Sequence, residues 1–365
     1  MNTIWKRYAE LLLKYSLDIR KGERLYVAST TLAVPLLKEI QALALDLGAI
    51  PEFDVHFEGQ NRRFYDHATE QALKAPPLLY SKAMETFDAY LNIRAPFNLS
   101  EMQGVDSDRL KLRAQALQPW YEMYSNRTAE GSMKRSLCQF PTPAAAQMAG
   151  MSLEDYSAFI FNACRLMEDD PVGEWLAVRA EQQKMVDYLN QCTQIRYVHE
   201  NWDICFSTAG RTWINSDGRA NMPSGEVFTA PVEDSVEGEI YFSYPSIYRG
   251  REVVGVRLKV KEGYITDWSA EKGEEVLDAV FETKGARRFG EAAIGTNYKI
   301  DRITRNILFD EKIGGSIHMA VGQSYYHCGG KNKSTIHWDL ISDMREGGEI
   351  YADEKLIYKN GGFLL

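Results

Sequence analysis

Hydrophobic residues in the first half of the chain alternate between helical and strand spacing. A period of about 3.6 residues indicates a helix over residues 4–18, and the apolar run Arg24–Ser29 is typical of a short buried strand. A second helical pattern over Leu32–Leu47 stops at Gly48, where glycine suits a helix end, and Ile50–Val55 predicts another strand. A strand, a helix and a strand of these lengths join parallel strands, so a parallel sheet is expected.

More helices are expected to cover this sheet. They are predicted over residues 62–84 with a break at Pro76-Pro77, over Leu110–Gln118 with Pro119 ending or kinking the helix, and over residues 152–189 with a break at Asp169–Gly173. The apolar run Ala89–Ile93 predicts a third strand. The first half therefore has the pattern of an α/β layer fold.

The pattern changes near residue 192, after which apolar and polar residues alternate as in half-buried strands. Strands are predicted over Gln194–His199, Asp203–Ser207, Gly238–Ser243, Val253–Lys261 and Gly263–Trp268, followed by one helix over Glu271–Arg287. A chain of 365 residues is also long for one core. We therefore predict an N-terminal α/β domain with a parallel sheet over residues 1–192, and a C-terminal β-rich, mixed α+β domain over residues 193–365.

Charge and composition exclude some classes of function. A net charge of −9 argues against a nucleic-acid or anionic-membrane surface, because both need a basic footprint. Five scattered cysteines without a C-x-x-C pair favour a reducing compartment, and no apolar stretch is long enough for a membrane span. A soluble, cytoplasmic protein is expected. A nucleotide-binding module is disfavoured, since no glycine-rich phosphate loop follows the strands.

Two glutamates of the second half lie in unusual surroundings. Glu226 belongs to the loop Asn221–Pro231, whose prolines and glycine would hold a carboxylate in place for a cation. The alternative is an ordinary turn with an exposed glutamate. Glu291 lies among small and apolar residues, where it is either desolvated for ligation or base chemistry, or paired with Arg287 or Arg288.

The richest cluster of candidate ligands comprises Glu311, His318, His337 and Asp339. Residues two apart on a strand face the same way, so His337 and Asp339 would both point at one cation, with Trp338 on the opposite side. Mixed imidazole and carboxylate groups are suited to zinc, cobalt or manganese. The other histidines are not candidate metal ligands. His327 belongs to an expected surface loop, and no carboxylate cluster surrounds His56, His67 or His199 in the sequence.

Together these stretches resemble the M29 metallopeptidases, the family of thermophilic aminopeptidase T. The matching segments of the second half are Asn221–Pro231, Phe289–Glu291, Leu308–Glu311, Ile317–Tyr325 and His337–Asp339. The segments Tyr8–Glu23 and Pro141–Met151 resemble the amino-terminal domain of that family. The resemblance extends over essentially the whole chain.

The resemblance implies a homodimeric aminopeptidase that releases N-terminal residues, with a leucine-like preference, from peptides with a free N-terminus. It implies two divalent cations (Co²⁺, Zn²⁺, Mn²⁺ or Mg²⁺) that activate a water. The implied ligands are Glu226, Glu291, Glu311, His318, His337 and Asp339. Glu291 and Tyr325 match catalytic positions, and a tyrosine near a bound carbonyl can donate a hydrogen bond to the developing oxyanion.

Two other functions fit the same ligands. A two-metal amidohydrolase acting on small amides or modified amino acids would use the same water activation, and a catalytically inactive metal-binding relative would keep only the ligands. The interval from Glu311 to His318, which contains Gly314 and Gly315, is longer than in aminopeptidase T. Glu311 is therefore either a ligand or the general base.

Overall fold

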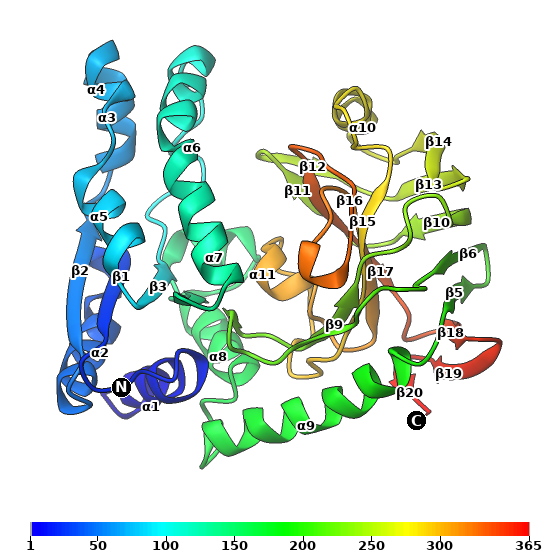
Figure 1. The fold of residues 1–365 in the computed structure, drawn as a ribbon, viewed down its shortest axis with the longest axis horizontal. Helices are drawn as coiled ribbons and strands as arrows, with labels where there is room; N and C mark the ends of the chain where they lie inside the picture. The colour runs from blue at the N-terminus through cyan, green and yellow to red at the C-terminus, as the bar shows by residue number, and fades with distance from the viewer. Residues whose placement is uncertain (1, 365) are drawn as a thin grey trace. The chain divides into compact units, whose positions relative to one another are not determined.

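A computed structural model describes residues 2–364, and the chain divides into two compact units (Figure 1). Unit 1 contains the residues up to Val172 together with Gly218–Met222. Unit 2 contains Gly173–Asp217 and the residues from Pro223 on. The boundary at residues 192 and 193 stays a prediction drawn from the hydrophobic pattern. The units defined by contacts divide earlier, because almost all of the helix α9 (Pro171–Leu189) belongs with unit 2.

Unit 1 is built on a parallel sheet of five strands in the order β2-β1-β3-β4-β8. The strands are β1 (Arg24–Thr30), β2 (Ile50–His56), β3 (Ala89–Arg94), β4 (Lys134–Gln139) and β8 (Asn221–Met222). The predicted parallel sheet is confirmed. The segment Gly218–Met222 returns to unit 1 because β8 pairs with β4.

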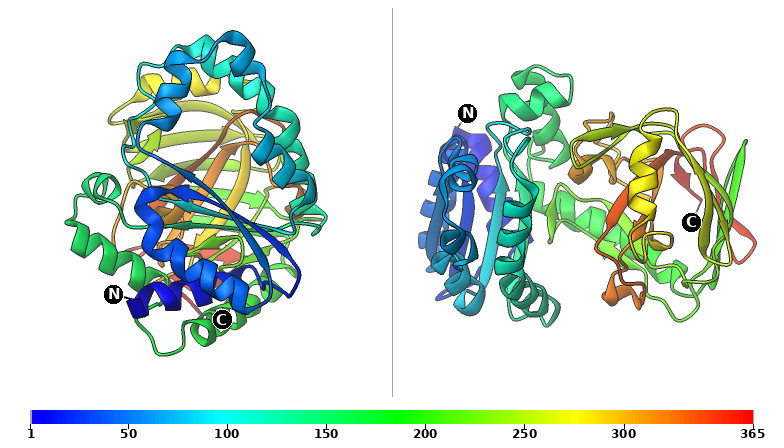
Figure 2. Two further views of the ribbon diagram at one scale, coloured as in Figure 1. Left: turned by 90° about the vertical axis from the view of Figure 1, so that its left-hand side faces the viewer. Right: turned by 90° about the horizontal axis from the view of Figure 1, so that it is seen from above.

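Helices lie on both faces of this sheet (Figure 2). They are α1 (Asn2–Glu10) and its continuation η1 (Leu11–Ser16), η2 (Thr31–Ala33), α2 (Val34–Asp46), α3 (Gln60–His67), α4 (Glu70–Lys74), α5 (Leu78–Thr86), α6 (Ser107–Ala129), α7 (Pro143–Met148) and α8 (Leu153–Ala163). Gly48 follows α2 with φ +76°, as its predicted place at a helix end requires. Tyr26 on β1 packs against Met84 and Phe87 of the α5 region.

Of the two outcomes expected at Pro119, an end or a kink, the helix end is excluded, since α6 continues through it to Ala129. A proline inside a helix removes one N–H donor and leaves a carbonyl without its partner. No residue of α6 is fully buried, so water can hydrate that carbonyl.

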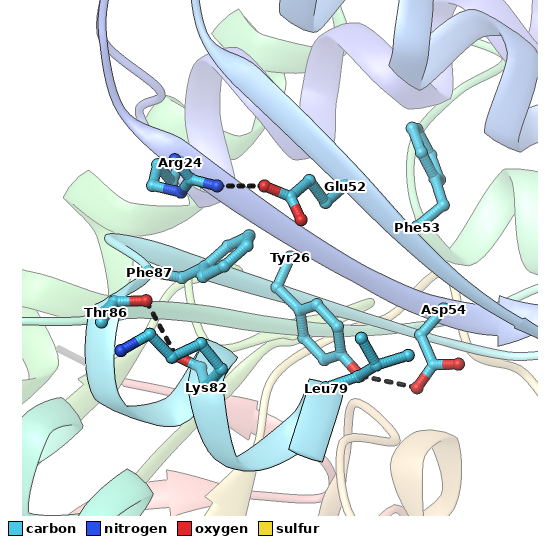
Figure 3. Close-up of a pocket in the computed structure, with 9 residues that line it drawn as sticks. All are labelled: Arg24, Tyr26, Glu52, Phe53, Asp54, Leu79, Lys82, Thr86 and Phe87. Atoms are coloured by element: carbon cyan, nitrogen blue, oxygen red, sulfur yellow. Dashed lines mark hydrogen bonds and ion pairs between the residues drawn. The ribbon is translucent and has the colours of Figure 1, made fainter. Parts of the chain in front are cut away.

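A cavity of about 420 Å³ opens beside β1 and β2 in unit 1 (Figure 3). Tyr26 and Phe87 supply aromatic surface, and the Tyr26 hydroxyl donates a hydrogen bond of 2.6 Å to Asp54 Oδ2. On the same strand as Asp54, His56 Nε2 lies 3.2 Å from Asp54 Oδ1. The polar groups of this cavity are therefore partners of one another.

Unit 2 contains two larger antiparallel sheets and one hairpin. The eight-stranded sheet has the order β14-β13-β10-β6-β5-β18-β19-β20, the five-stranded sheet β17-β16-β15-β9-β7, and the hairpin β11-β12. The strands are β5 (Gln194–His199), β6 (Trp202–Ser207), β7 (Ile214–Ser216), β9 (Glu226–Thr229), β10 (Glu237–Phe242), β11 (Ser246–Tyr248), β12 (Arg251–Val253), β13 (Val256–Lys261), β14 (Tyr264–Ser269), β15 (Phe289–Gly295), β16 (Ser316–Gly322), β17 (His337–Asp343), β18 (Glu349–Ala352), β19 (Lys355–Lys359) and β20 (Gly362–Phe363). The helices are α9, α10 (Glu274–Phe281), α11 (Ile307–Asp310) and η3 (Tyr326–Cys328).

Two predicted elements of unit 2 differ from the structure. The expected strand Val253–Lys261 is divided between β12 and β13. The expected helix Glu271–Arg287 is reduced to α10, because Lys272 instead bridges to Val254 and Gly285 takes a left-handed φ of +78°. A Cβ at Gly285 would lie 2.2 Å from the carbonyl oxygen of Lys333, so this glycine allows a close backbone approach.

The hydrophobic core of unit 2 joins the two large sheets. It includes Tyr197 and Phe242 from the eight-stranded sheet together with Ile294 and Met319 from the five-stranded sheet. The predicted fold class, a parallel α/β part followed by a β-rich mixed part, agrees with this architecture. Among the described residues, no helix is both long and apolar enough to cross a bilayer.

Candidate metal centre

Four strands of the five-stranded sheet place the candidate ligands on the face opposite the core. Along β16, Ile317, Met319 and Val321 enter the core while His318 lies between them in sequence. Because side chains alternate along a strand, His318 points away from the core. Val227 on β9 and Ala292 on β15 likewise enter the core and leave Glu226 and Glu291 on the other face.

The register of the sheet gives each of these side chains a small neighbour. His318 pairs with Ala293, Glu226 pairs with Gly295, and His337 pairs with Gly322. Glu291 and Asp339 both pair with Ala320. Cross-strand neighbours normally fill the space above a sheet, so alanine and glycine at these places leave room beside the carboxylates and imidazoles. This feature depends on strand register and was not found from the sequence.

A bulge at Gly290 directs Glu291 to this face. Phe289 pairs with Val321 and Glu291 with Ala320, so two steps on β15 match one step on β16. Such a bulge reverses the alternation of side chains, which is why Phe289 and Ala292 both reach the core. A Cβ at position 290 would lie 2.3 Å from the carbonyl oxygen of Gln323, so only glycine fits.

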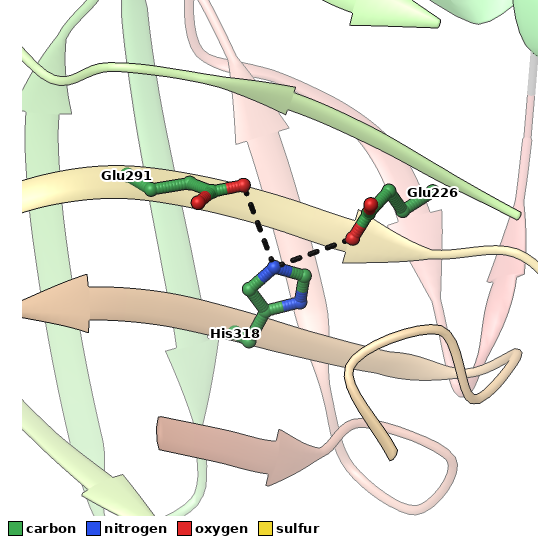
Figure 4. A group of neighbouring side chains, drawn as sticks. All are labelled: Glu226, Glu291 and His318. Atoms are coloured by element: carbon green, nitrogen blue, oxygen red, sulfur yellow. Dashed lines mark ion pairs between the residues drawn. The ribbon is translucent and has the colours of Figure 1, made fainter. Parts of the chain in front are cut away.

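Glu291 lies between two groups of potential ligands. Its Oε1 is 3.7 Å from His318 Nε2, and Glu226 Oε2 lies 3.4 Å from the same nitrogen (Figure 4). Its other oxygen, Oε2, is 3.3 Å from His337 Nε2, which is 3.7 Å from Asp339 Oδ1. Each group has three donors close enough to hold one metal ion, and Glu291 belongs to both.

His337 and Asp339 share one side of β17, as the H-x-D spacing predicts. Trp338 points the other way, where its ring packs 4.8 Å from that of Tyr248 and its Nε1 donates to Ser246 Oγ. His337 Nδ1 donates a hydrogen bond of 2.8 Å to the carbonyl oxygen of Gln323. That bond fixes the ring and leaves Nε2 free to face a cation.

Burial and mutual contact set the charges of this cluster. Burial raises the pKa of Glu226 to about 7 and that of Asp339 to about 6. Burial also opposes ionisation of Glu291, but His318 and His337 outweigh it and lower the pKa of Glu291 to about 2. Burial disfavours the charged imidazoles, yet the surrounding carboxylates raise the pKa of His318 to about 9 and that of His337 to about 10. Without metal, protons therefore occupy the imidazoles.

Glu311 stands outside both donor groups. It follows α11 and forms an ion pair with Lys312, a residue that the sequence did not single out. Lys312 Nζ also lies 3.5 Å from Glu226 Oε1, and its side chain is 0% exposed. Burial opposes the charge of the ammonium, but Glu226 and Glu311 outweigh it and keep the pKa of Lys312 above its usual range. No signal in the sequence distinguishes Lys312, which belongs to a charged run with Asp310 and Glu311.

A buried glutamine, Gln182 on α9, holds the start of β9. Its Nε2 donates to the carbonyl oxygens of Glu226 (3.0 Å) and Ser216 (3.1 Å), and its Oε1 accepts from Thr296 Oγ1 (3.0 Å). Because Gln182 binds the backbone of both paired strands, β7 and β9, it fixes the segment that carries Glu226. Helical periodicity alone could not show this role.

Tyr325 precedes η3 and faces the cluster. Its ring lies 5.1 Å from that of His337 and 5.4 Å from that of Phe228. Tyr325 as a whole is 42% exposed, but the partial desolvation of its hydroxyl, and then the carboxylates of Glu291 and Asp339, raise its pKa, so the hydroxyl remains a proton donor at neutral pH. His327 is exposed, as expected for a surface loop.

Neither glutamate has the non-functional surroundings that the sequence left open, an exposed turn for Glu226 and an arginine pair for Glu291. Glu226 is buried, not an exposed turn residue. The nearby arginines bind elsewhere: Arg287 Nε donates to the carbonyl oxygen of Phe281, and Arg288 Nη1 contacts that of Glu233. Glu291 instead contacts the two imidazoles.

The donor set fits a divalent metal ion. Glu226 Oε2, His318 Nδ1 and Asp339 Oδ1 are buried, and no described residue gives any of them a hydrogen bond. Buried polar atoms without a partner are costly, and a cation among mixed imidazole and carboxylate groups would satisfy the oxygens. A mixed shell of this kind is typical of metal-dependent hydrolases.

Comparison with known proteins agrees with that class. The chain belongs to the family of thermophilic metalloproteases (M29), which it matches over residues 1–363. The resemblance drawn from the motifs is thus confirmed, and so is the expectation of a metal-dependent peptide hydrolase.

Similar proteins cover nearly the whole chain. Aminopeptidase 2 of Geobacillus stearothermophilus is 32% identical over 353 residues, which are 87% of this chain and 83% of that protein. Aminopeptidase T of Thermus thermophilus is 27% identical over 95% of each chain. The solved structure of wild-type AmpT from Thermus thermophilus covers 99% of both chains with a TM-score of 0.85 at 24% identity, which confirms the fold class.

Proposed function

We propose that this chain is a two-metal aminopeptidase that removes the first residue from peptides with a free α-amino group. The observation that carries the proposal is the carboxylate of Glu291, whose two oxygens face different imidazoles. A carboxylate placed in this way can hold two cations at once. The names of the similar proteins from Geobacillus and Thermus support the choice of aminopeptidase.

Each cation would have its own ligands beside the shared Glu291. Glu226 Oε2 and His318 would hold one ion, and His337 with Asp339 would hold the other. Glu226 is a one-oxygen ligand in this scheme, because its Oε1 faces Lys312. When bound, the two ions would polarise the peptide carbonyl and make a water acidic near neutral pH.

The remaining chemistry belongs to side chains of the protein. With both oxygens of Glu291 engaged, Glu311 is the carboxylate left to accept a proton, at the oxygen that does not face Lys312. Tyr325 would donate its hydroxyl hydrogen to the oxyanion that develops on the carbonyl. The α-amino group of the substrate would bind a cation or a carboxylate of the cluster, which restricts cleavage to the first peptide bond.

The cysteines bear on the compartment of the protein, and the family resemblance bears on its assembly. All five cysteines are free, which suits a reducing compartment such as the cytoplasm. The homodimer stays a prediction of the family resemblance.

Substrates and metals together test this proposal. Chelator-stripped protein should regain hydrolysis of leucine p-nitroanilide when Co²⁺, Zn²⁺, Mn²⁺ or Mg²⁺ is added, and should leave N-acetyl-leucine p-nitroanilide intact. Equal cleavage of the acetylated compound would indicate the amidohydrolase instead. Full turnover without metal would rule out both.

A pair of histidine variants locates the ions. His337→Ala should lower the bound metal, measured by mass spectrometry of the elements, and abolish hydrolysis. His199→Ala is the matched control, because His199 lies in the same unit but stacks on Trp202 instead of facing carboxylates. Metal loss in both variants, or in neither, would contradict the assignment.

A further inference from the structure

A lysine, Lys312, lies beside the carboxylates that are proposed to bind cations, which is unusual because its side chain is itself a cation. Among the residues that the structure describes, it is the one fully buried lysine. Its backbone is tied down, since its carbonyl oxygen accepts a hydrogen bond of 3.0 Å from Asn297 N and Gly314 N donates to Asn297 O. The backbone position of Lys312 is thus fixed, and its fully buried side chain places the ammonium beside carboxylates and not in water.

The ion pairs of this ammonium lie on one side of the cluster. Within the described residues, its salt-bridge partners are Glu226 Oε1, at 3.5 Å, and Glu311 Oε1. Glu226 belongs to the ligand group of His318 and not to that of His337 and Asp339. A positive charge therefore already neutralises part of one ligand group and much less of the other.

The charge of Lys312 affects cation binding at the two ligand groups unequally. With metal bound, the imidazoles are neutral and the carboxylates of Glu226, Glu291, Glu311 and Asp339 carry four negative charges, one of which Lys312 balances locally. A divalent ion at Glu226 and His318 would lie near the ammonium and would be repelled by it. The repulsion falls with distance, so an ion at His337 and Asp339 is affected less.

We propose that Lys312 acts as a built-in cation that makes the two metal positions unequal. The position at Glu226 and His318 binds its ion more weakly than the position at His337 and Asp339. Lys312 also holds Glu311 outside the ligand shell, where it remains available as a base. This inference rests on the two-metal function proposed above.

Titration of chelator-stripped protein with Co²⁺ tests the inference directly. Calorimetry and the visible absorption of bound Co²⁺ should show two steps whose dissociation constants differ by about tenfold or more. Lys312→Met removes the charge and should tighten the weaker step by about tenfold, whereas Lys312→Arg should keep two unequal steps. Lys272→Met is the matched control: it breaks a surface pair with Glu252 (2.7 Å) and should change neither step.

A second pair of variants keeps the test valid if Lys312→Met does not fold. Glu311→Gln and the double variant Lys312→Met/Glu311→Gln compare the site with and without the ammonium when Glu311 carries no charge. The double variant should bind the second ion about tenfold more tightly than Glu311→Gln alone. If Glu311 were a metal ligand, both variants would lose the second ion equally.

The outcomes are distinct. Two equal steps in the wild-type protein, or a weaker step that does not tighten when Lys312 is replaced, would overturn the inference and leave the two-metal function standing. Binding of a single ion by the wild-type protein and by Lys312→Met would overturn the two-metal function, and the inference with it. A single ion in the wild-type protein and two in Lys312→Met would support the inference in its strongest form.

Discussion

The two units bury different kinds of polar residue. Among the described residues, the buried polar side chains of unit 1 are all neutral: Ser16, Ser29, Ser81, Ser136, Gln139 and Thr142. Unit 2 buries ionisable groups as well, namely Asp217, Glu226, Glu291, Asp310, Lys312, His318 and Asp339. Burying a charge is expensive unless it is paired or binds a metal. Unit 2 therefore carries a cost of burying charges that unit 1 avoids, and the proposed metal ions would offset it.

Sheet type explains where those charges can be placed. A parallel sheet covered on both faces needs apolar or neutral residues on each, and Tyr26 and Ala28 of β1 pack on one such covered face. One face of the five-stranded antiparallel sheet of unit 2 packs into the core that it shares with the eight-stranded sheet. The opposite face is also largely buried, and it carries carboxylates and imidazoles beside small residues such as Ala293 and Ala320. The proposed metal ligands and the core residues thus lie on opposite faces of the same strands.

The largest expected effect is the loss of activity on replacing Glu291 by glutamine. Because both ligand groups share this carboxylate, Glu291→Gln should lower kcat/KM on leucine p-nitroanilide by at least about 10³-fold. Bound metal should fall with it, and the metal-free protein should be less stable at neutral pH, because the ion pairs of Glu291 with His318 and His337 are lost. Glu52→Gln in unit 1, which breaks an exposed pair with Arg24, should change none of these quantities. A variant of Glu291 that kept its metal and its turnover would contradict the shared-ligand geometry.

The opposite pattern is expected from a core truncation in unit 1. Leu91 on β3 is 0% exposed, so Leu91→Ala should lower the free energy of unfolding by about 2–5 kcal/mol in a urea titration followed by circular dichroism. The dissociation constants for Co²⁺ should not change, because all the proposed ligands lie in unit 2. Weaker metal binding in the folded variant would show that the two units are less separate in energy than their buried residues suggest.

Local patterns were enough to predict most of unit 1. The periodicity around Gly48 and the apolar runs of β1, β2 and β3 encode parallel strands within short stretches of sequence. The continuation of α6 through Pro119 has a local cause too, since solvent can replace the lost hydrogen bond there. Strands that follow one another closely in the sequence also lie close together in this sheet.

The site of unit 2 could be predicted only in part. The residue types and the H-x-D alternation predicted that His337 and Asp339 share one side of a strand, but the position of Glu291 between the two groups depends on a bulge at Gly290. Strand register also decides that Ala320 lies between Glu291 and Asp339. The burial of Lys312 results from its tertiary contacts, and no spacing in the sequence indicates it.

Removal of metal should destabilise unit 2. At a free ion concentration a hundred times the dissociation constant, one site adds about 2.7 kcal/mol to the free energy of unfolding. Calorimetry of the protein with and without a chelator should therefore show a lower melting temperature after chelation. An unchanged melting temperature would mean that the carboxylates and imidazoles satisfy one another without ions.

The pH dependence of that difference has a definite sign. In the metal-free protein, His318 and His337 have pKa values of about 9 and about 10, above the ordinary 6.5. A raised histidine pKa stabilises the folded protein fully below pH 6.5, and that contribution is lost as the pH rises through the folded values. Metal-bound imidazoles are neutral and lose nothing. The gap in stability between metal-loaded and metal-free protein should widen between pH 6.5 and 10, and a gap that narrowed would contradict this arrangement.

The smallest effect is expected from the one His–Asp pair beside the cavity of unit 1. The hydrogen bond with Asp54 raises the pKa of His56, and the pair lowers the pKa of Asp54. The contribution of His56 is complete below pH 6.5 and is lost as the pH rises through its folded pKa, whereas that of Asp54 is complete above pH 3.8 and is lost as the pH falls through its folded pKa. The pair should therefore stabilise unit 1 most between these limits. Its side chains are 34% and 27% exposed, so His56→Gln should cost less than about 1 kcal/mol at pH 5 and still less at pH 9 in urea titrations. A larger effect at pH 9 than at pH 5 would show that His56 acts through packing and not through its charge. Among residues 2–364, the stabilising buried charges would then all lie in unit 2.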